Sequence, residues 1–395
     1  MLIPLLVGIL LGIVAGLLPG VHPNAISYLL GYMPADAMDL SIAIIASAAA
    51  NNILSLIPAI FLFVPDTETV LSVLPGHNMV QLGLGRKAIV VCGWAALLSL
   101  LFLLIILPVS FAALPSAYSA IRPVLGPLLA ALALFFLFEE RSKGIGGLAK
   151  GAFVFLLAGA LGVVVLDSPL LAEPLFPAFT GFFAFSSLLL SSGNASIPKQ
   201  ESWPSAVPDK MRALATVVLF GSLLGVAADL LPALGSPAQL ATFGSPLMAG
   251  SPSMFLALTT SITVGHSANS LVALQTIGKG RIGATAMVND LIGQPSTGTT
   301  LVLLAAFFIA TAVSIALLFV LSDLFIRFIG KVDLRKVNVL LFIYLLAAVL
   351  YTGGVAGILV AATATAMGTL PPLLGVRRTH LMGFLIVPTI LVLIV

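Results

Sequence analysis

Long apolar runs separated by short polar or Pro/Gly-rich joins dominate the chain. An α-helix needs about 17 to 25 mostly apolar residues to span the hydrocarbon of a bilayer. Runs of this kind predict ten transmembrane helices, near 2–18, 88–108, 118–138, 147–166, 174–192, 211–231, 299–322, 335–352, 354–370 and 379–395. Two further apolar runs, 38–64 and 252–278, are interrupted by polar residues near their middle.

The polar interruptions are the first candidates for a site. The run 38–64 carries Ser47, Asn51 and Asn52, and the run 252–278 carries His266, Ser267, Asn269 and Ser270. An unpaired amide in hydrocarbon costs several kcal/mol, so these groups need partners, water or a ligand. Helix–helix contacts through small and amide side chains are one interpretation. The other is that each run is a re-entrant helical hairpin whose polar tip binds a substrate, and we expect the second.

Composition restricts the class of protein. The chain has 395 residues, of which 60% are hydrophobic and 8% charged, and no soluble domain could bury that much apolar surface. We therefore expect an all-α polytopic protein of the cell membrane. The net charge of +3 rests on few residues and indicates an excess of Lys and Arg in loops on one side of the membrane rather than nucleic-acid binding.

One cysteine, Cys92, excludes disulfides within the chain and Cys-based metal sites. Motifs of nucleophilic, zinc or nucleotide enzymes are absent, so we expect no enzyme, no metal site and no cofactor beyond a coupling ion.

The two halves of the sequence resemble each other. Three short matches occur in the same order: Leu17–Gly20 with Leu230–Ala233, Ala50-Asn51 with Ala268-Asn269, and Gly85-Arg86 with Gly280-Arg281. They predict an internal repeat. Repeat 1 would cover 1–195, with five spans and the hairpin 38–64. A polar linker would follow at 196–210, and repeat 2 would cover 211–395, with five spans and the hairpin 252–278.

The positions of Lys and Arg predict the orientation of the repeats. With both hairpins entering and leaving on one side, the N-terminus lies outside and fourteen Lys and Arg residues lie inside, against three outside. The second half is then inverted relative to the first. Inverted repeats with interrupted segments at matching positions are typical of secondary transporters, and we expect an elevator-like mechanism.

Three more features are candidate functional residues. Gly20, His22 and Asn24 follow the abrupt end of the first span at Pro19, where free backbone amides could bind an anion. Asp229 and Asp290 are acids near the ends of predicted membrane segments and are candidates for binding a coupling ion.

Several segments also resemble a known family. The motif-bearing stretches are Gly12–Pro23, Ala49–Pro58, Pro75–Ala88, Gly181–Ser187 and Gly368–Pro388. They are similar to elements of the TctA permease family, the large membrane subunit of tripartite tricarboxylate transporters, and to its shorter archaeal branch in particular. The resemblance implies a carboxylate permease driven by an ion gradient. It also implies a periplasmic binding protein and a small membrane subunit as partners, although the chain lacks some of the family's motifs.

We therefore expect a secondary active transporter of a small anionic solute, most simply a carboxylate, coupled to Na⁺ or H⁺. A homodimer is compatible with this interpretation. Two alternatives stay open on sequence alone: a flippase for a lipid-linked anion such as a polyprenyl phosphate, and a membrane scaffold that transports nothing.

Overall fold

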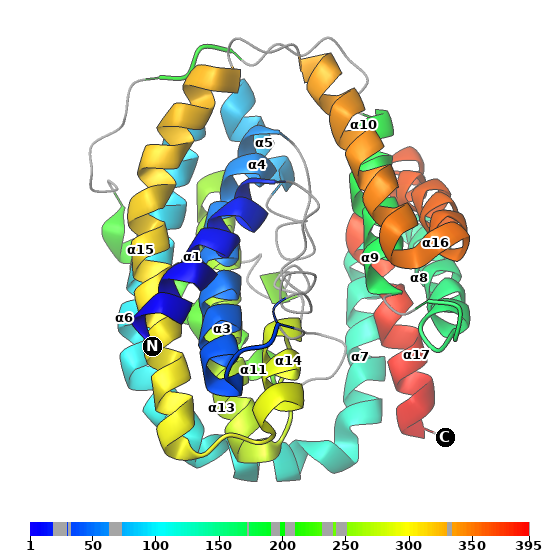
Figure 1. Cartoon of the computed structure of the whole chain (residues 1–395). Helices are drawn as coiled ribbons and strands as arrows, with labels where there is room; N and C mark the ends of the chain where they lie inside the picture. The colour runs from blue at the N-terminus through cyan, green and yellow to red at the C-terminus, as the bar shows by residue number, and fades with distance from the viewer. Residues whose placement is uncertain are drawn as a thin grey trace. The chain divides into compact units, whose positions relative to one another are not determined.

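The computed structural model describes residues 1–18, 30, 33–62, 73–171, 174–190, 198–201, 210–230, 240–241, 251–329 and 334–394, and every regular element in these ranges is helical (Figure 1). The α-helices are α1 (Leu2–Leu17), α3 (Ala37–Leu54), α4 (Leu56–Phe61), α5 (Val73–Gln81), α6 (Gly85–Ile121), α7 (Leu125–Phe138), α8 (Gly144–Val165), α9 (Leu175–Phe179), α10 (Ser186–Leu190), α11 (Met211–Ala228), α13 (Pro252–Ile277), α14 (Gly283–Ile292), α15 (Thr297–Ile329), α16 (Leu334–Leu374) and α17 (Gly383–Ile394). Short 3₁₀ turns and one π-helical segment, η3 (Thr180–Phe185), join some of them.

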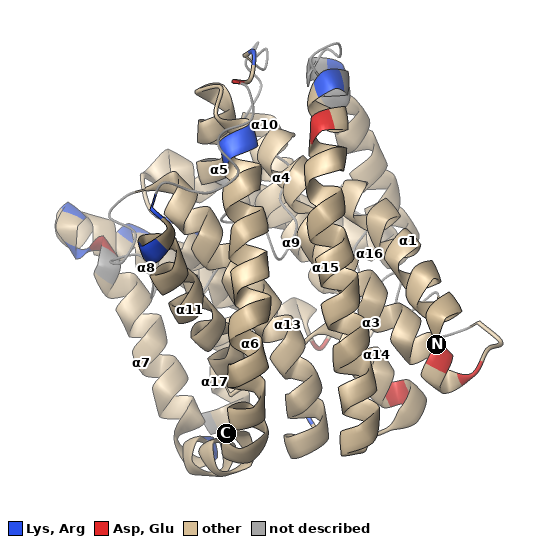
Figure 2. Cartoon of the chain, turned by 90° about the vertical axis from the view of Figure 1, so that its left-hand side faces the viewer, with Lys and Arg blue, Asp and Glu red and all other residues tan. Residues whose placement is uncertain are grey.

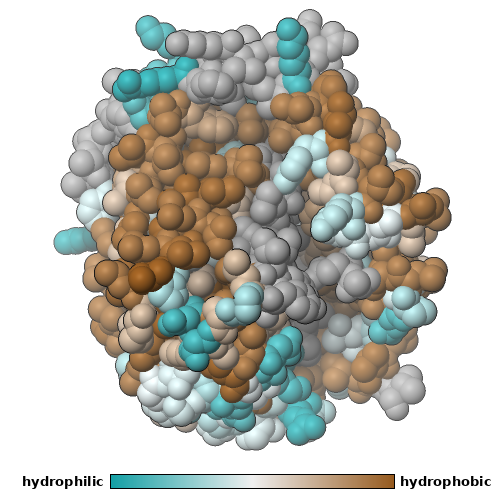
Figure 3. Space-filling view, in the orientation of Figure 1, coloured by the Kyte–Doolittle hydropathy of each residue, from teal (hydrophilic) through white to brown (hydrophobic). Residues whose placement is uncertain are grey.

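The protein is embedded in a membrane, as the apolar runs predict. Within the described ranges, five helical stretches are long and apolar enough to cross a bilayer: Ala37–Phe61, Gly85–Val165, Met211–Ala228, Thr297–Arg327 and Asn338–Leu374. A broad hydrophobic surface lies over α1 and α15 (Figure 3). Charged side chains gather at the ends of α6 and α15 and leave their middles uncharged (Figure 2). The count of ten spans stays a prediction.

Two compact units make up the chain, and each takes segments from both halves of the sequence. Unit 1 contains Met1–Tyr118 and Ser196–Asp333. Unit 2 contains Ser119–Ala195 and Leu334–Val395. The boundaries of the predicted repeats follow chain order rather than these units, and they stay a prediction.

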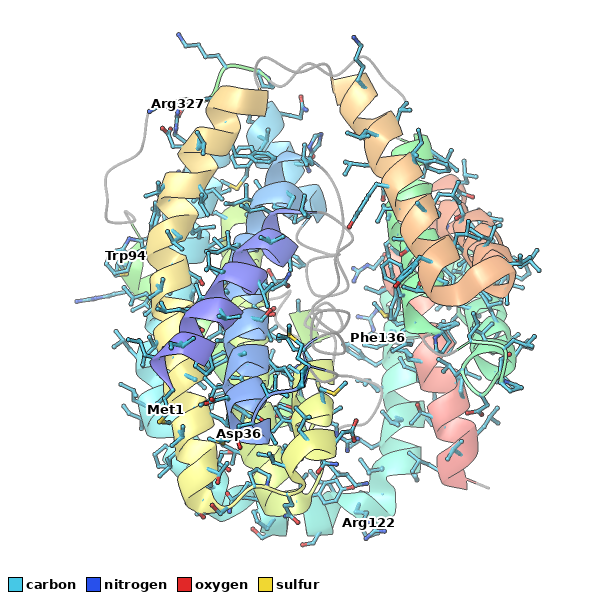
Figure 4. All side chains as sticks on the ribbon, viewed as in Figure 1. Met1, Asp36, Trp94, Arg122, Phe136 and Arg327 are labelled. Carbon is cyan, nitrogen blue, oxygen red and sulfur yellow. The ribbon has the colours of Figure 1, made fainter. Side chains whose placement is uncertain are left out.

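Helix α3 lies at the centre of unit 1. Asp36 caps its first turn, since the carboxylate accepts hydrogen bonds from the backbone amides of Met38 and Asp39 at 3.0 and 3.3 Å. Every residue from Leu40 to Leu54 is buried. Helices α1, α14 and α15 pack on it. Asp36 and Arg327, near the end of α15, lie at opposite ends of this unit (Figure 4).

Helix α13, from the second half of the sequence, is also buried within unit 1. It begins with Pro252 at its first position and ends at Gly278, whose φ of +66° suits a glycine C-cap. Helices α11, α5 and α15 pack on it. A hydroxyl cluster also ties it to α6 and α11, because Ser99 Oγ lies 2.8 Å from Ser222 Oγ and 3.4 Å from the Ser261 carbonyl.

Glycines let the neighbouring helices approach these two closely. On α1, a Cβ at Gly8 or Gly12 would collide with the carbonyl oxygens of Ala43 and Ser47. On α11, a Cβ at Gly221 or Gly225 would collide with α13 in the same way. Small residues spaced by four are the usual means of close helix contact in membranes.

The structure corrects the predicted place of the two hairpin turns. Helix α3 is continuous through Asn51 and Asn52, and a single αR residue, Ser55, joins it to α4. Helix α13 is continuous through His266 and Ser270. The prediction that each run turns back at its polar cluster is therefore wrong. Polar side chains leave the backbone hydrogen bonds of a helix in place, so a polar cluster by itself does not make the chain turn back.

Unit 2 is built from two helix pairs that also combine both halves. Helix α8 packs on α17, and α16 packs on η3. The rings of Phe182 and Phe384 meet edge-on at 5.5 Å. Gly354, with φ of +58°, divides α16 into two helices at the join predicted between 352 and 354.

Candidate functional site

The first part of the candidate site lies where α3 passes α13 in unit 1. Asn52 Nδ2 donates a hydrogen bond to Ser267 Oγ at 2.9 Å, and both side chains are buried. The two polar clusters, more than two hundred positions apart in the sequence, thus meet directly. The clusters therefore lie close together as parts of two continuous helices, not as the tips of two hairpins.

Asn51, beside it, has a different environment. Its side chain is 1% exposed, yet neither Oδ1 nor Nδ2 has a hydrogen-bond partner among the described residues. The hydroxyls of Ser47 and Ser55, one turn away on either side, are buried and equally without a partner in that part of the chain. A buried amide without a hydrogen bond costs about 1 to 3 kcal/mol. This face of α3 therefore has unused donors and acceptors, which a ligand could satisfy.

The second part of the site surrounds Asp229, which follows the last residue of α11. Its carboxylate is fully buried. Asn269 Nδ2 donates to Asp229 Oδ2 at 2.8 Å and to the Val226 carbonyl at 3.1 Å. Ser110, on α6, donates its hydroxyl hydrogen to Asn269 Oδ1. Groups from α6 and α11 thus hold Asn269 of α13 in one orientation.

His266 faces the same carboxylate. Its Nε2 lies 3.5 Å from Asp229 Oδ1, and both side chains are buried. Arg281, in the turn after α13, donates from Nε to the backbone carbonyl of Asp229 at 3.3 Å. Asp229 lies at the negative end of the α11 dipole, and nearby hydrogen-bond donors and one cation offset its negative charge.

A third set of contacts connects α13 to α14. Ser270 Oγ lies 2.9 Å from Thr285 Oγ1 and accepts a hydrogen bond from the Arg281 backbone amide at 2.8 Å. Because Thr285 donates to the Ile282 carbonyl at 2.9 Å, Ser270 must be the donor between the two hydroxyls. The turn that carries Arg281 is thereby anchored to α13.

The structure brings most of the predicted site residues into unit 1. Ser47, Asn51 and Asn52 lie on α3, and His266, Ser267, Asn269 and Ser270 lie on α13, with Asp229 beside them. Asp290 is exposed on α14 and outside this cluster. The predicted residues Gly20, His22 and Asn24 lie outside the described residues.

Sequence reasoning missed Ser110, Thr285 and Arg281. Ser110 is a lone hydroxyl in an apolar run, two residues after Pro108, and that pattern could have drawn attention to it. Arg281 follows the predicted run 252–278, and only the fold places it on the backbone carbonyl of Asp229. Within the described residues, no group of three or more His, Cys, Asp and Glu side chains could hold a metal ion.

Comparison with known proteins decides the family. The sequence profile of the tripartite tricarboxylate transporter TctA family matches residues 2–383, nearly the whole chain. The chain belongs to the TctA family. It is thus a membrane component of transport, as the resemblance of its motifs implied, and the family's tripartite organisation is consistent with the expected partner subunits. The chain is also similar to the uncharacterized protein MJ1079 of Methanocaldococcus jannaschii, with 29% identity over 379 residues, which is 93% of this chain and 91% of that protein. No solved structure matches the chain.

Proposed function

We propose that this TctA-family protein is the permease of a secondary active transporter, and that it binds a small carboxylate anion where α3 and α13 meet. The observation that carries the proposal is Asn51, whose buried carboxamide has no hydrogen-bond partner among the described residues. A group of this kind is costly in an empty protein, and a bound solute would supply its missing hydrogen bonds.

The depth of these residues supports a transport site. At 1.5 Å per residue, Asn51 lies about 15 Å from the nearer end of the helical stretch Ala37–Phe61. His266 lies about 16 Å from the nearer end of α13. Half the thickness of the hydrocarbon core is about 15 Å, so these distances support a site near the bilayer midplane, where secondary transporters bind their substrates.

The chemistry of the site suits an anion. Asn51 Nδ2 and the Ser47 hydroxyl are donors with no hydrogen-bond partner in the part of the chain that the structure describes, and Arg281 contributes a positive charge in the same unit. Carboxylate oxygens accept hydrogen bonds from amide, hydroxyl and guanidinium donors.

The packing around α3 and α13 supports an inverted repeat. A Cβ at Gly8 or Gly12 would meet the carbonyl oxygens of Ala43 and Ser47, and a Cβ at Gly221 or Gly225 would meet those of Leu258 and Ile262. The four-residue spacing is the same in both sets. We propose that unit 1 carries the site as one body in an elevator-like cycle.

Uptake of radiolabelled citrate by proteoliposomes tests the proposal. The chain with both Asn51→Ala and Asn52→Ala is expected to lose citrate exchange while retaining the gel-filtration profile of the wild type. Unchanged exchange by this variant would exclude the site.

The same assay with and without a binding protein and a small membrane subunit would reveal whether transport requires them. Movement of a fluorescent polyprenyl phosphate in place of citrate would instead favour a flippase.

A further inference from the structure

We propose that the coupling ion is a proton, and that Asp229 and His266 together hold it. This inference rests on the proposed function, because it names the ion that drives transport through the same unit. From the sequence alone, Asp229 is a candidate for binding a coupling ion and His266 for binding substrate, and no pattern relates the two. The structure instead places them 3.5 Å apart, from Nε2 to Oδ1.

Burial makes this pair a site for a proton rather than a surface ion pair. Asp229 is fully buried and His266 is 1% exposed. Asp229 Oδ1 accepts no hydrogen bond within the described residues, so one carboxylate oxygen is available to a proton. Paired acids and histidines inside membrane helices are the usual elements of proton relays.

The ligand geometry disfavours Na⁺ at this position. Hard cations take a shell of oxygen ligands. Asp229 instead faces nitrogen, with Asn269 Nδ2 on one oxygen and His266 Nε2 on the other. The carboxamide of Asn269 cannot be turned by 180° to present its oxygen to Asp229 without losing hydrogen bonds. Its Nδ2 also donates to the Val226 carbonyl, which can only accept, and its Oδ1 accepts from Ser110.

Among the described residues, the neighbouring elements add one cation and no second acid to this site. Helix α6 contributes the neutral Ser110, and the turn after α13 contributes Arg281, which contacts the backbone of Asp229 rather than its carboxylate. Lys279, in the same turn, lies over the ring of Tyr118 at 5.6 Å. On α14, Thr285 is neutral, and the acidic Asp290 is exposed.

The pair is connected to the proposed substrate site through adjacent residues. Ser267, next to His266, accepts the hydrogen bond from Asn52, which adjoins Asn51. A proton taken from water on one side neutralises the net negative charge of the neutral-His and carboxylate pair. The same proton leaves to water on the other side, so no other reactant is needed. Protonation of the pair therefore lowers the free-energy cost of carrying a bound anion through hydrocarbon, because the anion is then no longer accompanied by a second negative charge.

The first test does not depend on any substrate. The purified full-length protein in nanodiscs is acidified, and infrared difference spectroscopy follows the carboxylic acid C=O band. Asp229→Asn is expected to remove one band, and His266→Gln to shift its pH dependence. The matched control Asp39→Asn changes an exposed acid on α3 and is expected to leave that band unchanged. If Asp229→Asn keeps every carboxylic acid C=O band of the wild type, the proposal is overturned.

The second test measures coupling. In proteoliposomes loaded with pyranine, an imposed citrate gradient is expected to drive proton entry in the wild type. Asp229→Asn and His266→Gln are expected to lower proton-coupled flux by about tenfold or more. Undiminished proton flux in Asp229→Asn, or accumulation driven by Na⁺ without proton movement, would overturn the proton site. Absence of citrate exchange in the wild type would instead refute the proposed carboxylate transport, and the infrared band would still report on the proton site.

Discussion

At the scale of single residues, Asn51 and Asn52 show how one side-chain type can take two roles. Adjacent residues on a helix point about 100° apart. Asn52 therefore reaches Ser267, whereas Asn51 faces a direction in which no described residue satisfies it. The first amide joins two helices. The second lowers stability in the empty protein, and a site that binds a ligand explains its presence.

Substitution at Asn51 is accordingly expected to separate stability from function. Asn51→Leu, which has a similar volume, should raise stability by about 1 to 3 kcal/mol because it removes an unsatisfied buried amide. Citrate exchange should be lost in the same variant. Thermal unfolding in detergent and exchange in proteoliposomes measure the two effects. Asn52→Leu is the matched control, since it breaks the bond to Ser267 and is expected to lower stability; a stability loss in both variants would contradict the argument.

Asp229 and Asp290 make a second comparison at this scale. Both are candidates in the sequence, since each lies near the end of a predicted membrane segment. The fold buries Asp229 against Asn269 and His266 and leaves Asp290 exposed. Only burial distinguishes them.

At the scale of helices, glycines determine how closely α1 packs on α3. A Cβ at Gly12 would overlap the Ser47 carbonyl and the Ala50 side chain. Backbone atoms of a buried helix cannot move aside as a flexible side chain can. The contact therefore depends on the absence of a side chain rather than on a specific attraction.

Gly12→Ala is expected to lower the melting temperature in detergent, because the helices must separate along their contact. Gly146→Ala, on α8, is the control: nothing lies within 4 Å of its added Cβ. That variant should instead gain about 0.5 to 1 kcal/mol from the better helix propensity of alanine. Equal effects of the two substitutions would show that packing at Gly12 is not tight.

In unit 2, a buried ionic cluster joins two helix connections. Glu140, between α7 and α8, accepts a hydrogen bond from the Arg377 backbone amide at 2.8 Å and lies 3.2 Å from His380 Nε2. Lys143 lies 2.7 Å from its other oxygen. The connections after α7 and after α16 are thereby held together.

Glu140→Ala is expected to destabilise the protein by about 3 kcal/mol, because it leaves buried donors without their acceptor. A thermal melt in detergent measures the loss. The exposed Asp167→Asn provides the comparison and should melt with the wild type. A small effect of Glu140→Ala would indicate that water replaces the carboxylate.

At the scale of the whole molecule, both units combine segments from the two halves of the chain. Unit 1 holds α3 and α13, and unit 2 holds α8 and α17. An inverted repeat would produce this exchange of segments, since each half contributes equivalent elements to each unit. The orientation of the halves remains a prediction.

Cysteine labelling tests that orientation. With the native Cys92, which is buried, replaced by alanine, single cysteines near Lys143 and Lys336 should both react from the inside. Both positions are exposed. Membrane-impermeant maleimide applied to oriented vesicles measures the accessible side. Labelling from opposite sides would rule out the inverted arrangement, whatever the substrate.

The sequence by itself determined the membrane class, the helices and their family. These follow from local properties, namely run length, hydropathy and short motifs, and most described helices occupy the predicted runs, whereas α5 and α14 lie outside them. It also singled out Asn51, Asn52, His266 and Asn269, because polar groups are conspicuous in apolar runs. Only the tertiary structure decided that α3 and α13 continue through these residues and that Asn52 meets Ser267. It alone paired His266 with Asp229 and brought in Ser110 and Arg281. Such pairings depend on packing between helices far apart in the chain, which no local pattern encodes.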